Sequence, residues 1–320
     1  MALLHSTEAK RASELDPIAE KIAQAAARLP QIEDGSPEEA RAFRKKRGNP
    51  FAPKPAEIER VQDLLIPISS GSLMIRIYEP PGHRKPLRPG FIFYHGGGFV
   101  LGDVAQYDTV VQHIAATSGC VVFSVEYLLA PENKIKGIHR DGFEAYKWIR
   151  ENAAKLGIDE NRIAIGGDSA GGNLTIGVEL LCKQTNFPVP KYQVLVYPSV
   201  DLPMTFPSVK EFGEGYFLTK KAMEWFRSHY LESPEQAFDP DLLFLKRDVG
   251  GLSPAFVVTA GFDPLRDEGK AFADHLAEHS VGVEHVCYND MIHGFISFAG
   301  GVPAGMHLLQ EIGVKLKKFL

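Results

Sequence analysis

The feature that most constrains the fold is the run Gly-Asp-Ser-Ala-Gly at residues 167–171. The apolar, partly β-branched residues 162–166 before it predict a buried strand. Leu174, Val178 and Leu181 after it would share one face of a helix. A strand, a Gly-x-Ser-x-Gly turn and a helix form the setting of a nucleophile elbow, which raises the serine hydroxyl above the edge of a sheet. A glycine-rich turn without a catalytic role is the alternative, so other motifs have to decide between the two interpretations.

Residues 95–99, His-Gly-Gly-Gly-Phe, favour the catalytic interpretation. They follow an apolar strand predicted at residues 90–94. Acyl transfer needs N–H donors aimed at the oxygen that becomes negative in the tetrahedral intermediate, and glycines let the backbone come close enough to supply them. This loop and the N–H of Ala170, the residue after the serine, are expected to form an oxyanion hole. We interpret His95 as an organiser of the loop and not as a base.

An acidic residue follows a second predicted strand. Residues 255–260 are apolar and predict a buried strand, and Asp263 lies where the chain leaves it. Asp263 is therefore placed to reach a histidine on a neighbouring loop. Asp267 and Glu268 precede a helical pattern, and we interpret them as negative charges in the first turn of that helix.

One histidine has the position that a triad base needs. Residues 283–288 alternate as a strand, and a loop is expected at residues 289–295. His293 lies in this loop and is the only one of 11 histidines so placed. The order Ser169, Asp263, His293 is that of α/β-hydrolases and differs from that of the chymotrypsin and subtilisin families.

These residues resemble the hormone-sensitive-lipase-like family of α/β-hydrolase esterases, in the branch with a Gly-Asp-Ser-Ala-Gly elbow. The resemblance covers about residues 60–320, with matching motifs at residues 95–99, 126–127, 130–132, 167–174, 263–269 and 293–295. One position departs from the pattern: relatives often carry Tyr-Arg-Leu-Ala-Pro-Glu, whereas Tyr127 is followed here by Leu128. The usual arginine of that loop is therefore missing.

The resemblance implies an α/β-hydrolase fold, with a mostly parallel central sheet flanked by helices and a helical cap. It implies a triad of Ser169, Asp263 and His293, and oxyanion donors at Gly97, Gly98 and Ala170. It also implies hydrolysis of small-molecule esters with short to medium chains, with no metal or organic cofactor. Because members of the family often dimerise, the resemblance also allows a homodimer.

Composition excludes several classes of protein. A length of 320 residues suits one large domain with a small accessory element, and a net charge of −5 gives no basic footprint for nucleic acid. No apolar run reaches the roughly 18 residues of a membrane span, and the apolar start at residues 1–5 is too short for a signal peptide. We therefore expect a cytoplasmic protein whose 3 cysteines are buried thiols. The basic run at residues 44–47 is expected to be a solvated face.

Two segments interrupt the alternation of strands and helices. In the first, Asp16 and Ser36 begin predicted helices, each with a proline at the next position, and Ser36 opens a capping box. The apolar face expected on the first of these helices consists of Ile18, Ile22, Ala25 and Leu29. In the second segment a helix is expected from Thr219.

By resemblance these segments form a cap, although covering the sheet edge is the alternative. The predicted division is residues 1–50 and 201–248 for the cap and residues 51–200 and 249–320 for the hydrolase core. A hairpin is expected at residues 61–78 in the core. The candidates for an apolar substrate pocket are Phe99, Phe206, Phe212, Phe217 and Met223.

The sequence thus predicts a serine carboxylesterase that forms an acyl-enzyme on Ser169. An amidase, lactonase or carbamate hydrolase would use the same triad and is the alternative within enzymes. A non-catalytic ligand receptor on this fold is the alternative from another class, but such receptors lose the triad histidine, and His293 is present.

Overall fold

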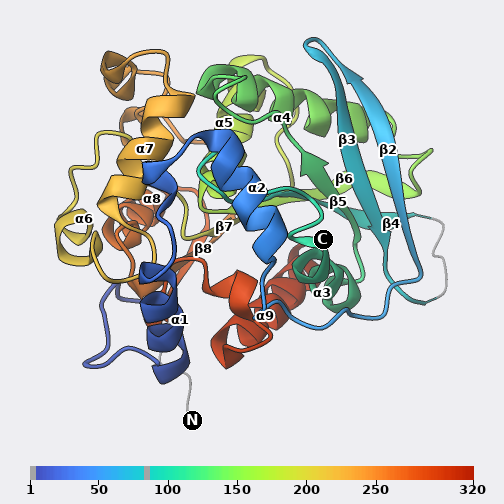
Figure 1. Ribbon diagram of the computed structural model, residues 1–320. Coiled ribbons are helices and arrows are strands. Elements are labelled where there is room, and N and C mark those ends of the chain that lie inside the picture. The colour runs from blue at the N-terminus through green and yellow to red at the C-terminus, as the bar shows by residue number, and fades with distance from the viewer. Residues whose placement is uncertain (1–4, 83–86) are drawn as a thin grey trace.

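The computed structural model describes residues 5–82 and 87–320 of the chain (Figure 1). Most of residues 1–5, which we used to argue against a signal peptide, therefore lie outside the described part. Within that part, one mixed sheet has the strand order β1-β9-β8-β7-β6-β4-β5-β3-β2. Its strands are β1 (His5–Ser6), β2 (Arg60–Ile68), β3 (Gly71–Glu79), β4 (Arg88–Tyr94), β5 (Val121–Glu126), β6 (Ile158–Asp168), β7 (Tyr192–Val196), β8 (Ala255–Phe262) and β9 (Val283–Ile292).

The central strands, β5-β4-β6-β7-β8-β9, run parallel, while β1, β2 and β3 pair antiparallel at the two edges. The α/β-hydrolase fold predicted from sequence is confirmed. The hairpin of β2 and β3 also lies where it was expected, with its turn at residues 69–70.

Helices cover both faces of the sheet. They are α1 (Pro17–Ala27), α2 (Pro37–Arg47), α3 (Asp108–Ser118), α4 (Ile135–Glu151), α5 (Ala170–Gln184), α6 (Pro207–Phe212), α7 (Lys220–Tyr230), α8 (Arg266–Glu278) and α9 (Pro303–Phe319), with short 3-10 turns η1 (Ile32–Asp34), η2 (Pro234–Phe238), η3 (Phe244–Lys246) and η4 (Phe295–Phe298). Side chains alternate along β4, so Phe91 and Phe93 pack in the cluster with α3 and α9, and Ile92 packs in the cluster with α4 and α5. None of the helices in the described ranges is long and apolar enough to cross a membrane.

Strand β9 is longer than the sequence indicated. We expected a loop from residue 289, but β9 continues to Ile292, which pairs with Phe262 beyond a register shift that leaves extra residues in β9. The N-terminal segment also holds this stretch, because the N–H of Ala12 donates to Asn289 and that of Asp16 donates to Asp290. His293 is therefore the first residue after a strand and lies at a well-defined position at the sheet edge.

The two N-terminal helices begin at the predicted caps. The Asp16 side chain accepts hydrogen bonds from the first turn of α1, and Ser36 and Glu39 form a complete capping box on α2. On the apolar face expected for α1, Ile22 is buried, and Ala25 and Leu29 line a cavity together with it, which leaves Ala25 exposed. Ala19 and Ala23, which were not expected on that face, are buried as well. Ala19 and Ala23 join the core cluster that contains α3 and α9.

The N-terminal segment both extends the sheet edge, through β1, and contacts the other insertion. Trp225 of α7 donates its indole N–H to the carbonyl of Gly35, between α1 and α2, at 3.2 Å. Figure 1 shows α2 beside α7, although almost 200 residues separate them. The segments expected to form the cap therefore meet in space.

Candidate active site

Ser169 sits in a tight turn between β6 and α5. Its backbone has φ 57° and ψ −118°, an unfavourable conformation for a residue with a side chain. The flanking glycines are required by contact: a Cβ at Gly167 would lie 2.3 Å from the carbonyl oxygen of Tyr94, and one at Gly171 only 1.9 Å from it. The turn therefore holds the serine hydroxyl above the sheet edge, as an elbow does.

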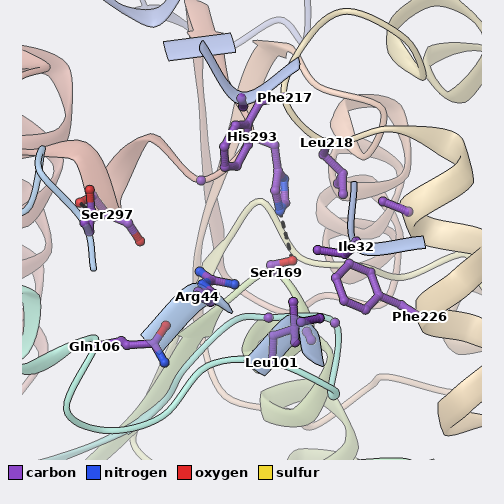
Figure 2. Close-up of a pocket in the computed structure, with 18 of the residues that line it drawn as sticks. Ile32, Arg44, Leu101, Gln106, Ser169, Phe217, Leu218, Phe226, His293 and Ser297 are labelled. Atoms are coloured by element: carbon purple, nitrogen blue, oxygen red, sulfur yellow. Dashed lines mark hydrogen bonds between the residues drawn. The ribbon is translucent and has the colours of Figure 1, made fainter. Parts of the chain in front are cut away.

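Ser169, His293 and Asp263 form a line of hydrogen bonds (Figure 2). The Ser169 Oγ lies 2.9 Å from His293 Nε2, and His293 Nδ1 lies 2.8 Å from Asp263 Oδ2. A carboxylate only accepts, so Nδ1 carries the ring proton and Nε2 accepts from the serine hydroxyl. Asp263 is fully buried and also accepts from the N–H of Leu265, and Tyr197 packs 4.6 Å from the imidazole centre. The histidine ring is thus fixed on two sides.

Three backbone N–H groups beside the serine have no acceptor among residues 5–82 and 87–320. Gly97 and Gly98 have φ of 126° and 62°, a region open mainly to glycine, and Ala170 is the first residue of α5. Within the described residues, no hydrogen bond uses the N–H of Gly97, Gly98 or Ala170. All three residues line the same cavity as Ser169 and His293. Free donors at a helix N-terminus and a glycine loop suit a developing oxyanion.

Asp168 ties the glycine loop to the elbow, a role that the sequence analysis missed. Its Oδ1 accepts from the N–H of Gly96 at 2.8 Å, and its Oδ2 accepts from the Tyr107 hydroxyl at 2.9 Å. Burial raises the pKa of Asp168 to about 6, while these two hydrogen bonds act in the opposite direction. The only signal in the sequence was the acid between a glycine and the serine, and it does not reveal the partners.

His95 organises the loop, as expected from its position. The ring is buried, its Nδ1 donates to the carbonyl of Gly96 at 2.8 Å, and it stacks on Tyr127 at 4.4 Å between centres. Burial lowers the pKa of His95 to about 4, so the ring is neutral at ordinary pH. It forms no hydrogen bond with Ser169 in the described structure.

Comparison with known proteins agrees with this geometry. Residues 91–297 match a family described as having the alpha/beta hydrolase fold. The chain belongs to the α/β-hydrolases. It is 37% identical over 259 residues to the carboxylic ester hydrolase LipN of Mycobacterium tuberculosis, with 78% of this chain and 68% of LipN covered. It is 36% identical to the ethyl acetate hydrolase of Pseudomonas putida, with 77% and 79% covered.

Solved structures extend the similarity over nearly the whole hydrolase. An ester hydrolase from the metagenome of Lake Arreo, solved with a bipyridine phosphonate derivative, superimposes with a TM-score of 0.91 at 35% identity. The match covers 95% of this chain and 98% of that protein. The resemblance to the hormone-sensitive-lipase-like esterases is thereby confirmed.

A cavity of about 600 Å³ opens above Ser169 in this hydrolase. Both insertions line it: Ile22 and Leu29 come from the N-terminal segment, and Met223 and Phe226 come from α7. Phe226 closes tightly on the glycine loop, since a Cβ at Gly98 would lie 2.3 Å from its ring.

The predicted pocket residues divide into two groups. Phe99, Phe217 and Met223 line the cavity of the hydrolase, whereas Phe206 and Phe212 do not. Phe212 is buried elsewhere, against the ring of Phe262. Phe206 caps α6 with its backbone and is half-buried, outside the cavity lining. Apolar composition alone could not separate side chains that face the cavity from those that pack the cap onto the core.

The loop that lacks the family's arginine receives one from helix α2. Arg41 of α2 pairs with both carboxylate oxygens of Glu132 at 2.8 and 2.9 Å, and it donates to the carbonyls of Val100 and Ala130. Leu128 therefore does not leave Glu132 unpaired. The sequence could not show this pairing, because about 90 residues separate the partners.

Glu268 has a structural role beyond the first-turn charge that we predicted. It is fully buried, and its Oε1 accepts from the N–H groups of Val200 and Asp201 at 2.7 and 3.2 Å. It thereby fixes the start of the second insertion. Asp267, in the first turn of α8, accepts from the N–H of Ser208 in α6.

Among the described residues, no three His, Cys, Asp or Glu side chains are grouped to hold a metal ion. His275, in the last turn of α8, and His279, which caps its C-terminus, each hydrogen-bond a backbone carbonyl. Cys120, Cys182 and Cys287 are free and buried.

Proposed function

We propose that this hydrolase is a serine carboxylesterase whose nucleophile is Ser169. The observation that carries the proposal is the line of hydrogen bonds from Ser169 through His293 to Asp263, at 2.9 and 2.8 Å. Its similarity to proteins named carboxylic ester hydrolase and ethyl acetate hydrolase supports an ester as the substrate. A non-catalytic receptor would not need this complete line of hydrogen bonds.

The geometry supports a two-step hydrolysis. The Ser169 oxygen attacks the ester carbonyl carbon while His293 Nε2 takes its proton, and Asp263 stabilises the resulting imidazolium. The N–H groups of Gly97, Gly98 and Ala170 receive the negative carbonyl oxygen. His293 then protonates the departing alcohol, which leaves an acyl-serine ester. Water, deprotonated by the same histidine, attacks this ester and releases the acid.

The cavity favours small-molecule esters with short to medium chains. Each methylene that enters apolar space contributes about 0.8 kcal/mol of binding, and the gain ends where the cavity ends. We assign residues 1–50 and 201–248 to the cap, since both segments line the cavity, and residues 51–200 and 249–320 to the core.

The nucleophile can be tested directly. A fluorophosphonate should label the wild type once per chain, on the peptide that carries Ser169, and Ser169→Ala should lose both labelling and activity by about 10³-fold or more. A screen of p-nitrophenyl esters, matched amides and lactones gives the substrate class. Undiminished labelling of the alanine variant would remove the assignment of Ser169, and faster turnover of amides or lactones than of esters would replace the esterase.

The setting of the enzyme is part of the proposal. We expect a cytoplasmic protein that needs no metal, so a chelator should leave its activity unchanged. A homodimer, suggested by resemblance to the family, is tested by light scattering on the purified chain.

A further inference from the structure

Arg44, in the last turn of α2, lines the cavity beside the nucleophile (Figure 2). Its side chain is half-buried, and Figure 2 shows it directed toward the space next to Ser169. Gln106 and Ser297 lie on the same side of the serine as Arg44 in this view, while three apolar side chains lie on the other: Ile32, Leu218 and Phe226. The cavity thus has one polar side, which contains a permanent cation, and one apolar side.

The Arg44 guanidinium has no partner in the part of the chain that the structure describes: neither an ion pair nor a hydrogen bond uses it. Arg41, one turn earlier, shows the contrast, since its guanidinium contacts Glu132 and two carbonyls. Asp103, an acid that lines the cavity, instead accepts from the backbone and the side chain of Gln106, both at 2.7 Å. The guanidinium therefore keeps its five donors available to a molecule in the cavity.

The expected solvated face at residues 44–47 is thus correct only in part. Basic residues in a last turn ordinarily complement the helix dipole, and exposed Lys46, which does not line the cavity, serves this purpose. Lys45 and Arg47 do line it and add positive charge at the rim. The last turn of α2 thus gives the cavity three basic side chains, although the chain has a net charge of −5. The acids that line the same cavity are Glu33, Asp103, Asp168 and Asp201.

The charge of Arg44 also reaches the catalytic centre. Burial raises the pKa of Asp168 to about 6, and Arg44 is among the groups that oppose this rise. Arg44 likewise opposes the rise that burial causes in the pKa of Tyr107. A negative group beside Ser169 would therefore lie in the field of this guanidinium.

We propose that Arg44 selects esters that carry a carboxylate, which its guanidinium binds while the ester carbonyl lies at Ser169. This inference rests on the proposed esterase activity and names its substrate class. A guanidinium presents paired N–H donors that match the two oxygens of a carboxylate, and such charge-assisted pairs are stronger than neutral hydrogen bonds. The carboxylate takes no part in the bond changes: water still divides the ester into an acid and an alcohol, and the anionic group leaves with one of them.

The test compares anionic esters with neutral esters of the same shape. Monoethyl glutarate carries the carboxylate on the acyl half and acetoxybutanoate carries it on the alcohol half, and the primary amide of each is its neutral match. The variants are Arg44→Gln, Arg44→Lys and the matched control Lys46→Gln, which removes the same charge from the same helix turn outside the cavity.

Arg44→Gln should lower kcat/KM for one carboxylate ester by about 10- to 100-fold, the usual range for a hydrogen bond to a charged group, mainly through KM. Its neutral match should lose much less, so the ratio of the two values of kcat/KM measures recognition of the carboxylate apart from any effect on the elbow, and circular dichroism reports that the variant is folded. For the carboxylate ester, kcat/KM of Arg44→Lys should lie between that of the wild type and that of Arg44→Gln. Lys46→Gln should resemble the wild type. The pair that responds identifies the half of the ester that bears the anion.

An equal loss on the carboxylate ester and its amide would overturn the role of Arg44, because it would indicate support of the elbow instead of recognition. This inference alone would be overturned if the wild type cleaves neutral p-nitrophenyl esters and Arg44→Gln changes kcat/KM for neither pair of esters. Failure of the wild type to cleave any ester would overturn the proposed function as well.

Discussion

Asp168 links the glycine loop to the elbow through one carboxyl group. It holds the N–H of Gly96, which precedes the glycines that we propose for the oxyanion hole, and it directly precedes Ser169, the proposed nucleophile. Because its partners are a backbone donor and the Tyr107 hydroxyl, the loop can keep its shape without help from bound substrate. Preorganised donors of this kind cost no reorganisation during the reaction.

Asp168→Ala should therefore impair turnover more than binding. We expect kcat to fall by about 10- to 10³-fold, the range for losing part of an oxyanion hole, with little change in KM. Asp168→Asn keeps an oxygen for the Gly96 N–H and should retain most of the activity. Steady-state kinetics on a p-nitrophenyl ester measure both variants, and an asparagine variant as impaired as the alanine variant would contradict this role.

The sequence indicated some of the residues that we propose for catalysis and not others, for a physical reason. Ser169, Asp263 and His293 each directly follow a strand, and strands leave a pattern in the sequence. Asp168 is held against Gly96 and Tyr107, which are distant from it in the chain, and Arg44 lines the cavity only because α2 is docked there. No local pattern in the sequence records either placement.

At the scale of elements, helix α2 is fastened to the core by Arg41. The side chain of Glu132 is 63% exposed, so its ion pair with Arg41 is screened by water and contributes little. The carbonyls of Val100 and Ala130 lie in part-buried hydrogen bonds with the same guanidinium. These carbonyl contacts are expected to provide most of the docking energy.

Arg41→Gln should consequently destabilise the enzyme more than Glu132→Gln does. We expect a loss of about 1–3 kcal/mol in the free energy of unfolding for the arginine variant and less than about 1 kcal/mol for the glutamate variant. Denaturant titration measures both, with Lys46→Gln as the control on the same helix. Equal losses in the two variants would assign the docking to the ion pair instead.

Prediction from the sequence was most successful where a helix begins at a capping residue. The caps at Asp16 and Ser36 placed α1 and α2 correctly, because capping is a local interaction. The predicted end of β9 was wrong, and the burial of Ala19 and Ala23 was not predicted, because strand pairing and helix docking determine both. Phe206 and Phe212 failed as pocket residues for the same reason: packing between α6 and its neighbours determines where they point.

At the scale of the whole molecule, buried acids make the stability depend on pH. Glu179 of α5 is fully buried, its Oε2 accepts only a long bond of 3.3 Å from the N–H of Ser253, and its Oε1 has no partner among the described residues. Burial raises its pKa from 4.5 to about 7. The folded chain thus holds this proton more tightly than the unfolded chain. The stabilisation is present at low pH and is lost as the pH rises through about 7.

Glu179→Gln, which stays neutral, should gain stability relative to the wild type as the pH rises. The difference in free energy of unfolding should grow by about 1–3 kcal/mol between about pH 5 and about pH 8.5. Denaturant titration at the two pH values measures it. Glu278→Gln, at the exposed end of α8, is the control and should show a constant difference. A constant difference for Glu179→Gln would contradict a raised pKa.

The overall architecture was predictable because many weak patterns agree on it. Strands 90–94, 162–166 and 255–260 all read as apolar runs between helices, and only a parallel sheet covered on both faces accommodates them. The cavity was not predictable, because its walls come from α1, α2 and α7, whose relative placement no single segment determines.

The division of the cavity into a cationic polar side and an apolar side has a stereochemical consequence. In the mechanism that we propose, the ester carbonyl would be held at a third point, between Ser169 and the N–H groups of Gly97, Gly98 and Ala170, all of which line the cavity. A stereocentre next to that carbonyl, with one anionic arm and one hydrocarbon arm, can satisfy all three points in only one configuration. Its mirror image would place the anion against Phe226 and the hydrocarbon against Arg44. The enzyme should therefore resolve a racemate of such esters, leaving one enantiomer behind.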